Sequence, residues 1–114
     1  MPYLMIQTNQ SIDSHASKEL LASASKLVAA ELGKPESYVM VALEANTDML
    51  FAGDDAPLAY LELKSIGLPE GKTGSLSAAL CQLMGDQLGV SQERVYIEFA
   101  NAERSMWGWN GGTF

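Results

Sequence analysis

The sequence predicts a two-layer α+β domain, in which a four-stranded mixed sheet carries two helices on one face. Two observations support this fold class: a strand, a helix and a strand follow one another twice, and the second half repeats the first at an offset of 56 residues, with Leu20 over Leu76. A chain of 114 residues has the length of one domain and can bury about two-thirds of the surface that it exposes when unfolded. We therefore expect a single domain over residues 1–114, with pseudo-repeats of about residues 1–57 and 58–114.

Two amphipathic helices are predicted over about residues 15–32 and 72–88. Apolar residues recur there at the spacing of one helix face. In the first helix they are Leu20, Ala24, Leu27, Val28 and Leu32, which superimpose on Leu76, Leu80, Leu83, Met84 and Leu88 of the second. A glycine, Gly33 or Gly89, follows each run, and glycine is the usual residue just past the end of a helix.

Four strand-like segments flank the helices: PYLMIQTN and YVMVALEA in the first half, PLAYLELKSIG and RVYIEFAN in the second. They are rich in β-branched and aromatic residues. A strand–helix–strand unit crosses over with a right-handed turn and leaves its two strands parallel. Because these strands carry apolar residues toward both sides, the sheet face without helices predicts oligomerisation.

Composition excludes several classes of function. The formal net charge is −7 and no basic cluster interrupts it, so we expect no nucleic-acid partner. No segment approaches the ~20 apolar residues of a membrane span, and no secretory signal is apparent, so we expect no membrane partner and a cytoplasmic location, with leaderless secretion left open. With one histidine, His15, and one cysteine, Cys81, we expect neither a metal nor another cofactor.

Three other features receive structural interpretations. Asp54 and Asp55 are adjacent in a turn bounded by glycine and proline, and such residues are usually solvated loop charges. Cys81 lies on the apolar stripe of the second helix, where a cysteine behaves as a small buried hydrophobe. The C-terminal segment RSMWGWNGGTF is too apolar for a free tail, so we expect it to pack against the domain or against another subunit.

Pro2 allows two interpretations. Proline has no amide proton to donate to a sheet, so it fits the first residue of a strand. A small second residue also normally allows removal of the initiator methionine, which would leave a free secondary amine at the start of the strand. Such an amine is a potential base.

Five motifs occur in a fixed order: a proline after Met1, GKP after the first helix, SIG after the third strand, RVYI in the fourth, and GWN followed by TF at the end. In this respect the chain resembles the macrophage migration inhibitory factor and D-dopachrome tautomerase family, and the similarity runs over essentially its whole length. The resemblance implies a homotrimer with active sites between subunits. It also implies that Pro2, freed of Met1, is the catalytic base.

The resemblance implies roles for other residues as well. Lys34 of GKP would hold the substrate carboxylate, and Ser65 and Ile66 of SIG would lie beside the proline. The family's apolar pocket would be lined by Tyr38, Trp107 and Phe114, with Tyr96 contributed by the neighbouring subunit. Two departures stand out: Glu98 replaces a family asparagine, and Trp107 replaces a smaller aliphatic residue.

These roles predict keto–enol tautomerisation of phenylpyruvate or D-dopachrome-like substrates, that is, of a small aromatic α-keto acid or enol. Burial and the nearby positive charge of Lys34 would lower the pKa of the Pro2 amine, so that it is neutral and can accept a proton. An ionised Glu98 would repel an anionic substrate, so we expect reduced activity. The CxxC motif of the mammalian cytokine is also absent, with Leu58 and Leu61 in place of its cysteines, so no thiol-oxidoreductase role is expected.

Two alternatives stay open. One is a non-catalytic, cytokine-like signalling or interaction protein with a vestigial pocket and, by family analogy, a cell-surface receptor. The other, ranked last, is a relative of the bacterial tautomerases that act on dicarboxylate enols. Those rely on arginines near the proline, and neither Arg94 nor Arg104 has a clear match.

Overall fold

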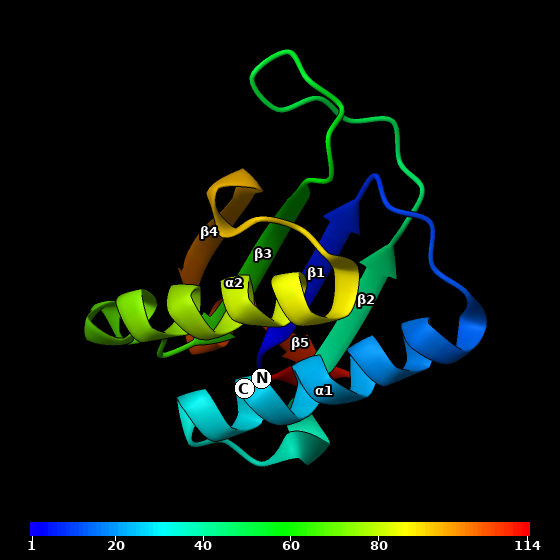
Figure 1. Cartoon of the computed structure of the whole chain (residues 1–114). Helices are drawn as coiled ribbons and strands as arrows, with labels where there is room; N and C mark the ends of the chain where they lie inside the picture. The colour runs from blue at the N-terminus through cyan, green and yellow to red at the C-terminus, as the bar shows by residue number, and fades with distance from the viewer.

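A computed structural model describes all residues, Met1–Phe114. Its main sheet contains four strands, β1 (Tyr3–Thr8), β2 (Met40–Glu44), β3 (Ala59–Ile66) and β4 (Val95–Ala102), in the order β2-β1-β3-β4 (Figure 1). The strands within each half are parallel, and the two halves meet through the antiparallel pair β1 and β3. The predicted mixed sheet of two strand–helix–strand units is confirmed.

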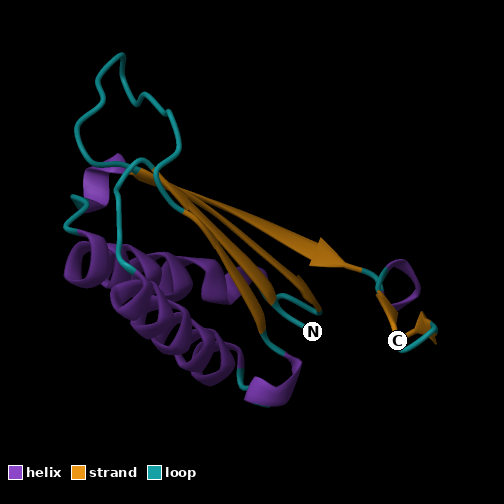
Figure 2. Cartoon of the chain, turned by 90° about the vertical axis from the view of Figure 1, so that its right-hand side faces the viewer, coloured by secondary structure: helices purple, strands orange, loops and turns teal.

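Two helices, α1 (Ser14–Leu32) and α2 (Thr73–Leu88), cover one face of this sheet (Figure 2). Both lie within one residue of their predicted bounds. Asp13 caps α1 by accepting a hydrogen bond from the Ala16 amide at 2.8 Å, which satisfies one of the free donors at a helix start. Gly33 ends α1 with φ at 63°, a left-handed conformation that costs glycine little.

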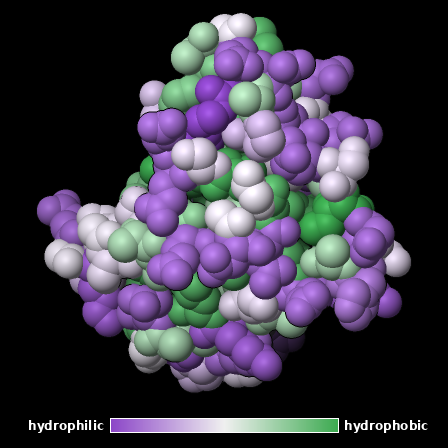
Figure 3. All heavy atoms as spheres, viewed as in Figure 1, coloured by the Kyte–Doolittle hydropathy of each residue, from purple (hydrophilic) through white to green (hydrophobic).

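The core lies between the helices and the sheet. Every second residue of β1 and β3 points into it, and Leu4, Ile6, Leu61 and Leu63 are all fully buried. Burying one such side chain stabilises the fold by roughly 1.5–3 kcal/mol. Cys81 belongs to this core, as its position on the helix stripe predicted. The outer side of the helices is mainly hydrophilic, with apolar patches between the charged groups (Figure 3).

The opposite sheet face, which we call the open face, has no helix over it (Figure 2). The sequence led us to expect it to be apolar, and this was only partly right. Met40 and Tyr96 are exposed on the two outer strands, but the middle of the face carries the polar side chains of Tyr60, Glu62 and Lys64. These residues alternate along β3 with the buried ones, since successive strand residues point to opposite faces.

The long connection between β2 and β3 protrudes from the end of the sheet (Figure 1). It is tied down by Arg94, which lies in the 3₁₀ turn Gln92–Arg94. Its guanidinium donates hydrogen bonds to the backbone carbonyls of Pro57, Ala56, Asp54 and Phe51, at 2.9–3.4 Å. Asp54 caps its own turn by accepting from the Ala56 amide at 2.8 Å, and Asp54 and Asp55 are both exposed. Arg94 thus holds the loop, and the two acidic residues are loop charges, as predicted.

The chain ends in a hairpin of two short strands, β5 (Gly108–Trp109) and β6 (Gly112–Thr113). Between them, Asn110 and Gly111 have φ of 52° and 81°, as in the primed turns that suit two-residue hairpins. Three further 3₁₀ turns span Glu36–Tyr38, Glu70–Lys72 and Arg104–Met106. The hairpin lies on the side of the sheet away from the helices (Figure 2), and its aromatic residues pack against Tyr38 of the same chain.

Candidate functional site

A cavity lies where the start of β1, the 3₁₀ turn Glu36–Tyr38 and the C-terminal hairpin meet. Its volume is about 560 Å³, within the range of pockets that hold small molecules. Eleven residues line it, and eight of them are hydrophobic. The lining residues are Met1, Tyr3, Ser37, Tyr38, Val39, Met40, Lys64, Trp107, Gly108, Trp109 and Phe114. We call this cavity the N-terminal pocket.

Aromatic rings form one wall of the N-terminal pocket. Tyr38 meets Trp109 and Phe114 edge to face, at centroid distances of 6.1 and 6.3 Å, and Trp109 stacks on Phe114 at 5.3 Å. The Phe114 amide donates to the Trp107 carbonyl at 3.2 Å, which holds the C-terminus against the hairpin. The structure therefore brings Tyr38, Trp107 and Phe114 together along one cavity. Sequence reasoning missed Trp109, although its motif, GWN, had been singled out.

Pro2 lies at the base of the same region. Its side chain is fully buried, and its carbonyl accepts a hydrogen bond from the Met40 amide at 3.0 Å. With Met1 in place, the Pro2 nitrogen is part of the amide bond to Met1, and it is Met1 that lines the pocket. Desolvation, and secondly the positive charge of Lys34, lower the pKa of the Met1 amino group below its usual value.

Lys34, Ser65 and Ile66 converge on one backbone atom. The Lys34 ammonium and the Ser65 hydroxyl both donate to the Ile66 carbonyl, at 2.7 and 3.2 Å. Ser65 and Ile66 are buried at the end of β3, and the antiparallel register, with Tyr3 opposite Lys64, places Ser65 next to Pro2. These predicted residues thus surround the start of β1, although none of the three lines the N-terminal pocket itself.

Tyr96 and Glu98 lie elsewhere in the chain. Both are exposed on β4, the strand at the far edge of the sheet from β2. The Tyr96 ring packs on Phe51 at 4.8 Å and lines a second, wholly hydrophobic cavity of about 230 Å³ beneath the protruding loop. A single chain therefore does not bring these two predicted residues to the N-terminal pocket.

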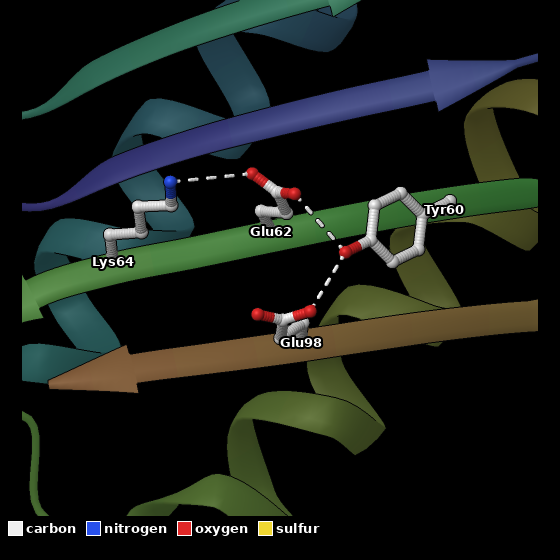
Figure 4. A network of polar contacts seen from close by, with 4 residues as sticks. All are labelled: Tyr60, Glu62, Lys64 and Glu98. Carbon is white, nitrogen blue, oxygen red and sulfur yellow. Dashed lines mark hydrogen bonds and ion pairs between the residues drawn. The ribbon is translucent and has the colours of Figure 1, made fainter.

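Glu98 belongs to a polar network on the open face (Figure 4). The Tyr60 hydroxyl lies 3.1 Å from both Glu62 Oε1 and Glu98 Oε2, and Glu62 Oε2 lies 3.6 Å from the Lys64 ammonium. Desolvation, with the hydrogen bonds to Glu98 and Glu62, raises the pKa of Tyr60 to about 12. The network ends at Lys64, which lines the N-terminal pocket. Sequence reasoning missed Lys64.

No three histidine, cysteine, aspartate or glutamate side chains lie close enough together to hold a metal ion. Neither helix combines the length and the apolar character needed to cross a membrane. The chemistry available at the N-terminal pocket is thus that of an amino terminus, two lysines near it, and an aromatic wall.

The duplicated strand–helix–strand fold and the aromatic pocket at the start of β1 define a class of protein that three comparisons identify. The family model described as macrophage migration inhibitory factor (MIF) matches residues 1–114. A homologue of this factor from Brugia malayi is 42% identical over 115 residues, which cover 100% of this chain and 99% of that protein. The mouse factor, from Mus musculus, is 34% identical with the same coverage.

Solved structures agree with the sequence comparisons. A homologue of the factor from Prochlorococcus marinus has a TM-score of 0.93 at 38% identity, and 98% of each chain is covered. The structure of the factor from Trichinella spiralis gives 0.90 at 34% identity, with 98% of this chain and 99% of that one covered. The chain belongs to the macrophage migration inhibitory factor family.

Proposed function

We propose that this protein, once Met1 is removed, is a tautomerase that interconverts the keto and enol forms of phenylpyruvate or a D-dopachrome-like compound, with Pro2 as the base. The observation that carries the proposal is the position of the N-terminus. Met1 lines an aromatic-walled cavity, so its removal would expose the Pro2 nitrogen to that cavity. Family membership supports the same class of activity.

A neutral secondary amine can carry out both proton transfers. The Pro2 nitrogen takes a proton from the carbon next to the keto group, and the electron pair moves to the keto oxygen. The resulting ammonium returns a proton to that oxygen and gives the enol; the reverse reaction follows the same path. A base near neutral pKa is best suited to this task. The two causes that lower the pKa of the Met1 amine, desolvation and Lys34, would act on a free Pro2 amine too.

Lys34 is the proposed partner of the substrate carboxylate. An ammonium has three donors, and the hydrogen bond to the Ile66 carbonyl uses one. The aromatic wall of Tyr38, Trp109 and Phe114 offers a surface on which an aryl ring can pack. Ser65 and Ile66 would position the end of β3 beside Pro2.

We further propose that the protein works as a homotrimer. The exposed Met40 and Tyr96 on the outer strands are surfaces that subunit contacts would cover. In such a trimer Tyr96 and Glu98 would reach the pocket from the neighbouring subunit. The negative charge of Glu98 would repel the substrate carboxylate and stabilise protonated Pro2, so the activity would be lower than with a neutral residue.

The test compares proteins whose Met-free N-termini have been verified by mass. We expect Pro2→Gly to lower the rate of phenylpyruvate and D-dopachrome methyl ester tautomerisation by about 100-fold to 1,000-fold, the usual contribution of a positioned acid or base. The matched control is Pro69→Gly, which changes an exposed proline and should leave the rate unchanged. Equal background rates in the wild type and Pro2→Gly would favour instead a non-catalytic, cytokine-like interaction protein with a vestigial pocket.

A further inference from the structure

We propose that Lys64 forms a second anion subsite in the N-terminal pocket, so that the pocket prefers an aromatic ligand with two acidic groups, a carboxylate on its side chain and another on its ring. The inference rests on the proposed function in two respects only: that the N-terminal pocket binds the ligand, and that Lys34 pairs with the first carboxylate. It concerns binding and requires no turnover.

Within one chain, Lys64 is the only charged side chain among the pocket-lining residues, and that chain contributes no acidic side chain to the lining. The chain as a whole carries a formal charge of −7, so an accessible cation in a mainly hydrophobic cavity is an exception to the general charge. A few charged groups placed among apolar walls are the usual arrangement by which a pocket orients its ligand.

The position of Lys64 follows from the strand register. Lys64 lies opposite Tyr3 of β1, and Tyr3 is also opposite Met40 of β2. All three residues line the pocket, so the side chain of Lys64 belongs to the row of open-face residues nearest to the N-terminus. This placement depends on the sheet and on no flexible loop.

Lys64 is only weakly paired with its present partner. Its ammonium lies 3.6 Å from Glu62 Oε2, and its side chain is 48% exposed. That separation exceeds the usual length of an N–H···O hydrogen bond, and ion pairs between exposed groups are weak. The other oxygen of Glu62 accepts a hydrogen bond from Tyr60, which fixes the carboxylate on β3 (Figure 4). Glu62 can therefore orient Lys64, while the N–H donors of the Lys64 ammonium stay available to a ligand.

Two cations are thus anchored at the same end of β3. Lys64 is part of the strand, and Lys34 is held by the carbonyl of Ile66, two residues further on. Lys34 lies outside the cavity lining and Lys64 within it. A ligand can place one carboxylate toward Lys34 and its ring against the aromatic wall. Lys64 is then the second cation, within the cavity, that can pair with an acidic substituent on the ring.

The experiment measures binding of two stable probes to the Met-free full chain. The monoanion is 3-phenylpropanoate, and the dianion is 3-(4-carboxyphenyl)propanoate. Both tryptophans of the chain, Trp107 and Trp109, line the pocket, so quenching of their fluorescence reports occupancy. We expect the wild type to bind the dianion about fivefold more tightly, as an ion pair worth roughly 1 kcal/mol would give. Added salt should reduce this preference.

Variants decide whether the preference belongs to Lys64. Lys64→Met should abolish it, Lys64→Arg should retain it, and Lys26→Met, an equal loss of charge on the exposed side of α1, should leave it unchanged. The subsite is overturned if the wild type shows no preference, if Lys64→Met keeps it, or if Lys64→Arg or Lys26→Met loses it. A protein that prefers the dianion but does not tautomerise phenylpyruvate would support the subsite and contradict only the proposed function.

Discussion

The two faces of the sheet differ sharply, although the same strands build both. Along β3, Leu61 and Leu63 are fully buried under the helices, whereas Glu62 and Lys64 point to the open face. The covered face has the close-packed apolar core that stabilises a domain of this size. The open face has charges, a tyrosine with a raised pKa and one wall of the N-terminal pocket. Alternate residues of one strand therefore serve stability and the candidate site.

The largest expected difference between the two faces is in stability. Leu61→Ala should lower the free energy of unfolding by about 2–5 kcal/mol because it leaves a cavity in the core. Glu62→Ala, its neighbour on the open face, should cost less than about 1 kcal/mol because it removes only contacts between partly exposed groups. Urea denaturation at one fixed protein concentration measures both values. Equal losses would contradict the division of roles between the faces.

A smaller effect is expected at Glu98. Glu98→Gln removes the charge but keeps an acceptor for the Tyr60 hydroxyl, so kcat/KM for phenylpyruvate should rise about fivefold, as the loss of roughly 1 kcal/mol of charge repulsion would give. Glu93→Gln removes an equal charge from an exposed position before the start of β4 and is the matched control. No change, or a fall, in the Glu98 variant would contradict the proposed position of Glu98 near the substrate.

The smallest effect concerns Tyr60. Because its pKa is raised to about 12, the folded protein holds this proton more tightly than the unfolded chain does. The associated stability is present below pH ~10, the usual pKa of tyrosine, and is lost as the pH rises through the folded pKa. The phenolate absorbance difference between the wild type and Tyr60→Phe should therefore appear near pH 12.

The same titration has an internal check. Glu62→Gln and Glu98→Gln should each lower the pKa of Tyr60, because each replaces a charged acceptor by a neutral one. If all four tyrosines ionised together near pH ~10 in the wild type, the Tyr60 network would not persist in solution.

The sequence predicted the elements whose signals are local. The leucine stripes and the glycines that follow them placed both helices, and the duplicated pattern indicated the sheet. The polarity of the open face was harder to predict, because it depends on which residues of β3 point away from the helices. The sequence-based prediction assumed that apolar residues of the strands would face both sides of the sheet.

The candidate site residues show the same limit, because a residue whose place depends on strand pairing gives no local signal. Tyr38, Trp107 and Phe114 were assigned to a pocket through the family resemblance alone, and in the structure all three line the N-terminal pocket. Lys64 was missed because its place in the pocket depends on the register between β1 and β3, two strands far apart in the sequence. The alternation of Leu63 and Lys64 was the available signal. The contact of Glu98 with Tyr60 likewise depends on the pairing of β3 with β4.

The most direct test of the central claim is the pKa of the Pro2 amine in Met-free protein, measured from the ¹⁵N chemical shift of Pro2 as a function of pH. An ordinary α-amino group has a pKa of about 8, and we predict a lower pKa for the Pro2 amine. The same pKa should set the rising limb of the pH–rate profile for phenylpyruvate. Replacing the Lys34 cation, as in Lys34→Met, should raise it. A Pro2 pKa at or above the ordinary value, unconnected to the pH–rate profile, would contradict the account of Pro2 as a neutral base.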